Sequence, residues 1–229
     1  MIQATAPVTS SWWSWSYAAE SLPAILEGLG TTVVATVLGA ILAYALGLVF
    51  ALLRRSRWRI VRTVTYWVVE FIRTTPLVGQ LFFLYFVLPQ LGISFSALVT
   101  GVIGLGLHYA AYTSEVYRAG IEGVPPGQWE ASTALSLPAL RTWTSVILPQ
   151  AIPRVLPALG NYTIALFKET PLLFTISVAE MVTAAYGLGG RNLRYVEPLT
   201  IVGLLFLVLS IISALLVQLL ERRLGQRHA

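Results

Sequence analysis

The sequence predicts an all-α integral membrane protein with five transmembrane helices, and three observations support this prediction. Hydrophobic residues make up 56% of the 229 residues and charged residues only 11%, whereas a soluble domain carries roughly 25% charged residues. Several uncharged stretches reach the ~20 residues that a helix needs to cross a bilayer. Arginines gather beside these stretches, as the positive-inside rule describes. We therefore treat residues 1–229 as one transmembrane domain.

The composition also limits the chemistry that the chain can carry. Cysteine is absent, which excludes disulfides, thiolate nucleophiles and cysteine metal sites. Aspartate is absent and only two histidines occur, His108 and His228, so we expect no catalytic residue, no cofactor and no metal. The net charge of +5 could suit nucleic acid, but arginines beside apolar spans fit membrane orientation better. Residues 1–19 are uncharged, so the basic start of a signal peptide is missing.

The first span is predicted at residues 28–53, after a short interfacial helix at residues 22–27. The span is uncharged for 26 residues, and five arginines follow it between Arg54 and Arg62. Because basic residues favour the cytoplasmic side, this end lies inside and the N-terminus lies outside.

The second and third spans are predicted at residues 70–89 and 97–117. Residues 74–114 contain no charge, which is enough for two spans, and Pro89–Ser94 is the strong break within them. The second span thus crosses to the outside and the third returns to the inside, which places the following loop, residues 121–153, in the cytoplasm.

The fourth span is predicted at residues 156–179 and carries Lys168 and Glu169 in its middle. The fifth, at residues 198–220, is uncharged for 23 residues. It is followed by Arg222, Arg223 and Arg227, so the C-terminus is predicted inside. We find no internal repeat, which argues against a secondary transporter built from inverted halves.

Residues 127–157, the central segment, are amphipathic and lie between two stretches apolar enough to span a membrane. Apolar residues recur on one helical face, at Leu137, Leu140, Trp143 and Ile147. Prolines suited to a helix start precede the segment, and Ser136 and Pro138 interrupt it. We expect two short helices with a bend, one face of which docks on a partner. The alternative is an ordinary amphipathic cytoplasmic loop.

Charged residues at membrane depth are costly and usually face a cavity or a partner, and polar groups with aromatic faces can hold a zwitterion. The candidates for a translocation path are His108, Tyr109, Tyr112, Lys168 and Glu169. For Lys168 and Glu169, the alternative is that Pro171 breaks the helix and both side chains satisfy freed backbone groups. For His108, the alternative is a hydrogen-bonded packing role.

Two further pairs of charged residues lie three positions apart. They are Glu70 with Arg73 and Glu115 with Arg118, a spacing that allows ion pairs on one helix face. We expect these pairs to be structural and to lie near the cytoplasmic surface.

The central loop resembles the cytoplasmic loop of ABC importer permeases, where Glu-Ala-Ala is followed after three residues by Gly and after nine more by Ile-x-Leu-Pro. Here Glu130-Ala131-Ser132 matches the first part and Val146-Ile147-Leu148-Pro149 the last. Ser136 stands in place of the glycine, and because serine adopts a positive φ less readily, we expect the bend to be built differently. The resemblance implies a type I importer permease with a coupling helix seated on an ATPase. The residues implied in this contact are Gly127, Glu130, Ala131, Ser132, Ser136, Leu148 and Pro149.

From about Gly28 to Arg223 the chain resembles the polar-amino-acid branch of these permeases. The motifs are Arg73-Thr74-Thr75-Pro76-Leu77, Glu115-Val116-Tyr117-Arg118-Ala119-Gly120-Ile121 and Lys168-Glu169-Thr170-Pro171-Leu172. Residues 105–109, 167–173 and 194–200 are most similar to ectoine and hydroxyectoine permeases, which implies a cyclic zwitterionic solute. The alternative is a polar amino acid such as glutamine, glutamate, arginine or histidine.

The resemblance further implies an importer in the bacterial plasma (inner) membrane, surrounded by lipid. Its partners would be ABC ATPase subunits, a second and related permease, and an extracytoplasmic substrate-binding protein. The chain has no Gly-x-x-x-x-Gly-Lys-Ser/Thr nucleotide motif, so we expect no enzyme activity of its own. A channel, a secondary transporter and a membrane enzyme are the alternatives from other classes, and scattered Glu and His disfavour the last.

Overall fold

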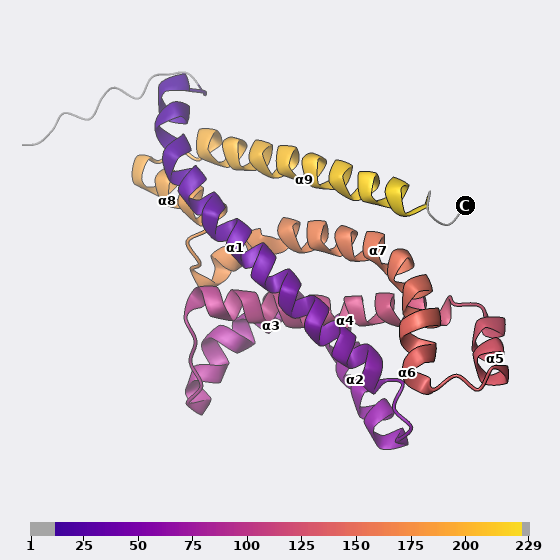
Figure 1. Cartoon of the computed structure of the whole chain (residues 1–229). Helices are drawn as coiled ribbons and strands as arrows, with labels where there is room; N and C mark the ends of the chain where they lie inside the picture. Colours follow the sequence, from indigo (N-terminus) through magenta and orange to yellow (C-terminus); the bar gives the residue numbers. More distant parts are fainter. Residues whose placement is uncertain (1–11, 226–229) are drawn as a thin grey trace, which may run out of the picture.

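The computed structural model describes residues 12–225, and every regular element within that range is a helix. The longest, α1 (Trp15–Leu53), has 39 residues and runs obliquely across the molecule (Figure 1). The short helix predicted at residues 22–27 is not separate, because α1 continues through Pro23. The predicted span at residues 28–53 is therefore the C-terminal part of a longer helix.

Small residues let α4 (Ala97–Glu122) pack closely against α1. A Cβ added at Gly47 of α1 would collide with Thr113 of α4, and one added at Gly106 of α4 would lie 2.6 Å from the Leu42 side chain. Thr113 also donates a hydrogen bond to the backbone oxygen of residue 43, at 2.9 Å. Close approach at small residues is how helices associate within membranes.

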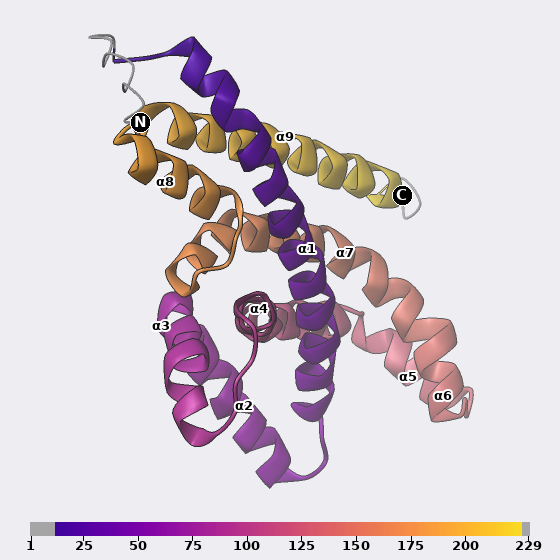
Figure 2. The ribbon, with the colours of Figure 1, turned by 90° about the vertical axis from the view of Figure 1, so that its left-hand side faces the viewer.

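The third predicted span lies within α4, which occupies the centre of the bundle. Figure 2 shows α4 nearly end-on, and α1, α3 and α7 all contact it. Hydropathy does not place α4 among the helices apolar enough to cross a membrane. Its position explains this result, since neighbouring helices rather than lipid cover it and small residues take the place of large apolar ones.

The second predicted span, residues 70–89, is not one continuous helix. α2 (Arg59–Thr74) ends within it, and α3 (Leu77–Phe82) continues through a π-helical turn (Phe83–Val87) and a 3-10 turn (Leu88–Leu91). The two parts meet at 104°. Pro76 causes the break, since it disfavours helical geometry at the preceding Thr75, which has ψ 139°.

The central segment contains the two short helices and the bend that the sequence predicts. α5 (Pro126–Ala134) is followed by α6 (Ala139–Arg141) and a π-helical turn (Thr142–Ile147), which leads directly into α7 (Leu148–Glu169). Between α4 and α7 the chain therefore leaves the bundle and returns to it.

The predicted boundaries of the fourth span, residues 156–179, are wrong. α7 begins eight residues before residue 156 and ends at Glu169, where a 3-10 helix (Thr170–Ile176) begins around Pro171. α8 (Met181–Asn192) follows at a bend of 46°. The fifth predicted span lies within α9 (Val196–Gly225).

Two helices, α1 and α9 as far as Leu219, are long and apolar enough to span a membrane, and up to four spans result if each bent pair counts as one. The C-terminal ends of α1 and α9 lie on the same side of the molecule as α5, and α8 lies on the opposite side (Figure 1). The count of five spans and the orientation predicted from arginine placement both stay predictions. Residues 1–11 and Arg227, which also entered that prediction, lie outside the described residues.

Candidate functional site

A cavity of about 230 Å³ lies between α4 and α7. It is lined by His108, Tyr109, Tyr112, Tyr162, Ala165 and Glu169. The rings of Tyr109 and Tyr112 lie 6.2 and 5.8 Å from that of Tyr162, centroid to centroid. One carboxylate, that of Glu169, therefore stands among three phenol rings and an imidazole.

Helical periodicity brings these side chains to one place. Tyr162 and Glu169 lie seven residues apart, two turns along the same face of α7, and His108 and Tyr112 lie four apart on α4. Gln80 supports this arrangement from α3. Its side-chain oxygen lies 3.3 Å from His108 Nδ1, while its amide nitrogen donates to the backbone oxygen of residue 72 at 2.8 Å.

The structure brings together four of the five predicted path residues, namely His108, Tyr109, Tyr112 and Glu169. Lys168 does not line the cavity and its side chain is exposed. Neighbours on a helix point about 100° apart, so only one of the two charged residues can face α4. Tyr162 was missed, although its seven-residue spacing from Glu169 could have signalled it.

The cavity suits a small molecule with a positively charged group. Glu169 Oε2 is buried and has no hydrogen-bond partner within residues 12–225, so it is available to a donor from a ligand. Aromatic faces attract cations electrostatically. Within the same described range no group of three or more His, Cys, Asp and Glu side chains could hold a metal.

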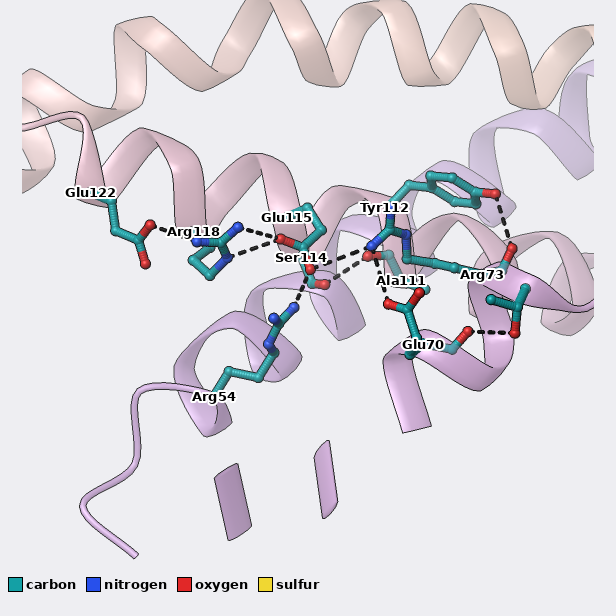
Figure 3. Close-up of polar contacts among 10 residues, drawn as sticks. Arg54, Glu70, Arg73, Ala111, Tyr112, Ser114, Glu115, Arg118 and Glu122 are labelled. Carbon is teal, nitrogen blue, oxygen red and sulfur yellow. Dashed lines mark hydrogen bonds and ion pairs between the residues drawn. The ribbon is translucent and has the colours of Figure 1, made fainter. Parts of the chain in front are cut away.

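A network of ion pairs adjoins the cavity and is centred on Glu115 of α4. Its carboxylate pairs with Arg54 at the end of α1, with Arg118 at 2.8 Å and with Arg73 of α2 at 3.7 Å (Figure 3). Arg73 also lies over the ring of Tyr112, at 5.5 Å. The predicted pair Glu115–Arg118 is therefore present, and Arg54 and Arg73 extend it to three helices.

The other predicted pair, Glu70–Arg73, is present at 3.5 Å on α2. Tyr112 links this pair to the cavity, because its hydroxyl donates to the backbone oxygen of Arg73 at 3.4 Å while its ring lines the cavity wall. The ion network and the cavity thus share one side chain.

The second candidate site is the exposed face of the central segment. Of the residues implied in ATPase contact, Gly127, Glu130, Ala131, Ser136, Leu148 and Pro149 are exposed, whereas Ser132 is buried. Ser132 instead donates to the backbone oxygen of Gln128 at 2.7 Å. Leu135 and Leu140 are 72% and 77% exposed. An exposed glutamate and two exposed leucines on one short segment give a surface suited to a protein partner.

Aromatic residues hold this segment against the bundle. The rings of Trp129 and Trp143 meet edge to face at 5.4 Å, and the Arg55 guanidinium lies over both, 5.9 and 5.6 Å from their centroids. Beneath them, Ile121 and Ile147 are buried in one apolar cluster. The exposed face is therefore carried on a packed support.

Ser136 forms the bend in the way that a glycine would. Its φ is +52°, its N–H donates to the Thr133 oxygen at 2.9 Å, and the N–H of Leu137 donates to the Ser132 oxygen at 3.0 Å. These two bonds are the Schellman pattern that ends helices with a left-handed residue. The expectation of a differently built bend is therefore wrong, because Ser136 adopts the positive φ itself and the bend keeps both hydrogen bonds.

Comparison with known proteins decides the family. Residues 43–226 match the family described as the inner membrane component of binding-protein-dependent transport systems. This chain belongs to that family. It is an ABC transporter permease of the bacterial inner membrane, so the expectations of a transport protein rather than an enzyme and of an inner-membrane location are confirmed.

Its relatives are amino-acid permeases. The probable amino-acid ABC transporter permease y4tG of Sinorhizobium fredii is 49% identical over 93% of this chain and 92% of its own length. The arginine permease ArtQ of Bacillus subtilis is 38% identical over 89% and 93%. A crystal structure of an amino acid ABC transporter with histidines has a TM-score of 0.87 at 34% identity, covering 92% of this chain and 99% of that one. The chain is thus an amino-acid ABC transporter permease with the type I fold.

Proposed function

We propose that this permease forms the translocation path for a polar amino acid in a binding-protein-dependent importer. The observation that carries the proposal is Glu169 Oε2, which is buried and has no hydrogen-bond partner within residues 12–225, in a cavity walled by aromatic rings. Every amino acid carries an α-ammonium group, and this carboxylate can accept a charge-assisted hydrogen bond from its N–H. The names of the relatives, which include arginine and cystine permeases, support the same substrate class.

The prediction of ectoine or hydroxyectoine rests on three short segments of sequence. Ectoine is a zwitterion whose positive charge is shared between two ring nitrogens, and aromatic faces attract such a cation too. The relatives described above are named for amino acids, so we place the polar amino acid first and keep ectoine as the competing substrate in the assay.

The central segment is the proposed coupling element. Glu130 and the exposed Leu135 and Leu140 form the surface that an ATPase subunit would contact. Closure of the ATPase pair on ATP would push this surface, and the support formed by Arg55, Trp129 and Trp143 would pass the movement to the bundle. A related permease and an extracytoplasmic binding protein complete the proposed complex.

The substrate is tested by ATP hydrolysis in proteoliposomes that hold this chain, its companion permease and the ATPase. Binding protein is added with arginine, with glutamine or with ectoine. We expect an amino acid to stimulate hydrolysis and ectoine not to. Stimulation by ectoine alone would reverse this order, and a permease that binds no ATPase would contradict the importer.

Two adjacent residues test the cavity. Glu169→Gln removes a charge-assisted hydrogen bond worth about 1.5–3 kcal/mol, so uptake at limiting substrate should fall by roughly ten- to hundredfold. Lys168→Gln changes a charge at the next position, outside the cavity, and should leave uptake nearly unchanged. Equal losses in the two variants would count against a substrate site at Glu169.

The coupling surface has its own matched pair of variants. Glu130→Lys should abolish the stimulation of ATP hydrolysis by loaded binding protein while the chain still inserts. Glu221→Lys makes the same change on another exposed glutamate, near the end of α9, and should keep the stimulation. Normal coupling in the Glu130→Lys variant would exclude Glu130 from the ATPase contact.

A further inference from the structure

A second polar cavity, of about 300 Å³, lies at the end of α1 where it meets α2 and α4. Four arginines line it, Arg54, Arg55, Arg62 and Arg118, together with the carboxylate of Glu122. It is separate from the aromatic cavity, with which it shares no lining residue. The wall of this cavity is mainly positive, because it carries four arginines and one glutamate, whereas the charged residue in the wall of the aromatic cavity is Glu169.

Two of the four arginines have acidic partners. Arg54 pairs with Glu115, and Arg118 pairs with Glu115 at 2.8 Å and with Glu122 at 2.6 Å (Figure 3). Arg55 and Arg62 take part in no ion pair within residues 12–225. Arg55 and Arg62 thus place two positive charges beside the cavity for which the described residues supply no paired carboxylate.

The helix that carries Arg62 is built for the membrane surface. Ile60, Val64, Trp67 and Phe71 recur at spacings of four, three and four on α2, and all four are exposed. The buried residues of α2, Thr65 and Val69, lie on the opposite side of the helix. A helix with an exposed apolar face and basic residues lies in the headgroup region of a bilayer.

From the exposed apolar face of α2 and the arginines beside it, we expect the cavity to lie at the depth of the lipid headgroups, on the side predicted to be cytoplasmic. Basic pockets between helices on this side of a membrane bind anionic lipid headgroups. Thr63, which also lines the cavity, adds a hydroxyl that can donate to a phosphate oxygen. The exposed apolar face of α2 gives the acyl chains of such a lipid a surface to lie on.

We propose that this cavity binds the phosphate of an anionic phospholipid of the inner leaflet, through Arg55 and Arg62. The bound lipid would neutralise the two unpaired arginines and join α2 to the support of the central segment, since Arg55 also lies over Trp129 and Trp143. This inference is independent of the transported substrate.

The test uses the permease assembled with its companion permease and ATPase in a neutral detergent. The intact complex is titrated with dioleoyl phosphatidylglycerol, with dioleoyl phosphatidylcholine and with inorganic phosphate, and bound ligand is counted by native mass spectrometry. We expect the anionic lipid to bind at concentrations where the zwitterionic lipid and free phosphate do not. Equal binding of phosphatidylcholine, or occupation by free phosphate, would overturn the proposal.

Arg62→Gln is the decisive variant, because Arg62 is exposed and, among the residues that the structure describes, has no ion pair whose loss would disturb the fold. Removing one arginine near an anionic lipid should weaken binding about fivefold. Arg59→Gln is the control, since Arg59 is an exposed arginine on the same helix that does not line the cavity. Equal weakening in both variants would indicate general attraction to a basic surface and would overturn the site.

Discussion

Replacing Gly28 by alanine should force α1 and α8 apart. A Cβ at Gly28 would lie 2.8 Å from the carbonyl carbon of Glu180 and 2.9 Å from the amide nitrogen of Met181. Carbon atoms pack best at about 3.5–4.0 Å, so the two backbones would have to separate by roughly 0.7–1.2 Å. Backbone atoms cannot move aside by a change of rotamer, and overpacking of this kind costs about 1–3 kcal/mol.

The same separation would weaken the start of α8. The amide of Met181 donates to Thr32 of α1 at 3.4 Å, and the Glu180 carboxylate caps α8 by accepting from the amide of Val182 at 2.9 Å. Both contacts need α8 in its present position. We therefore expect the cost to lie in the upper half of that range, about 2 kcal/mol or more.

Gly30 provides the control on the same helix. It is exposed, and a Cβ there would meet nothing within 4 Å, so Gly30→Ala should only add helix propensity, worth about 0.8–1 kcal/mol. Thermal unfolding of the purified complex, followed by tryptophan fluorescence, measures both variants. The same propensity gain offsets about 1 kcal/mol of the cost at Gly28, so at roughly 2–4 °C per kcal/mol Gly28→Ala should lower the midpoint by about 2–4 °C. An unchanged or higher midpoint would refute the close contact of α1 with α8.

Two further predictions concern stability. Glu115→Gln leaves three arginines without their shared carboxylate and should cost about 2 kcal/mol, which is less than the loss of a fully buried pair because solvent reaches the network. The control is Glu122→Gln, whose side chain is 51% exposed and whose replacement should cost under about 0.5 kcal/mol. Equal unfolding midpoints of the two variants in the thermal assay would contradict this prediction. Ser136→Gly should stabilise the bend by up to about 1 kcal/mol, since it removes the left-handed strain of a side chain, and Ser136→Val should destabilise it. Slower proteolysis of the central segment in the glycine variant, and faster proteolysis in the valine variant, is the expected result.

Much of the fold follows from the sequence because charge and length determine where a chain can enter a membrane. The arginines after Leu53 mark the end of α1, and the uncharged residues 198–220 lie within α9. Residues 70–89 were predicted as one span because the length of uncharged sequence was the criterion, and length carries no information about the turn that the chain makes at Pro76. A local backbone rule at Thr75 and Pro76 predicts the break better than hydropathy does.

The candidate cavity could be predicted only in part, because packing decides which helical faces meet. Sequence places both Lys168 and Glu169 in one span, but only the rotation of α7 against α4 determines that Glu169 faces Tyr109. The contact between Arg54 and Glu115 likewise joins residues 61 positions apart. Spacing within one helix carries no information about such pairs, whereas Glu115–Arg118 and Glu70–Arg73 follow from it directly.

α4 connects the two candidate sites. It runs without a break from Ala97 to Glu122, while α2–α3 and α7–α8 are bent. Along it stand Tyr112 at the cavity wall and Glu115 at the ion network, and the Gly123 oxygen that ends it accepts from Arg154 of α7. If this unbroken helix moves as one body, a displacement of its C-terminal end would shift Tyr112 or break the ion pairs of Glu115. Since those ion pairs join α4 to α1 and α2, we expect the three helices to move together and to change the cavity as a whole.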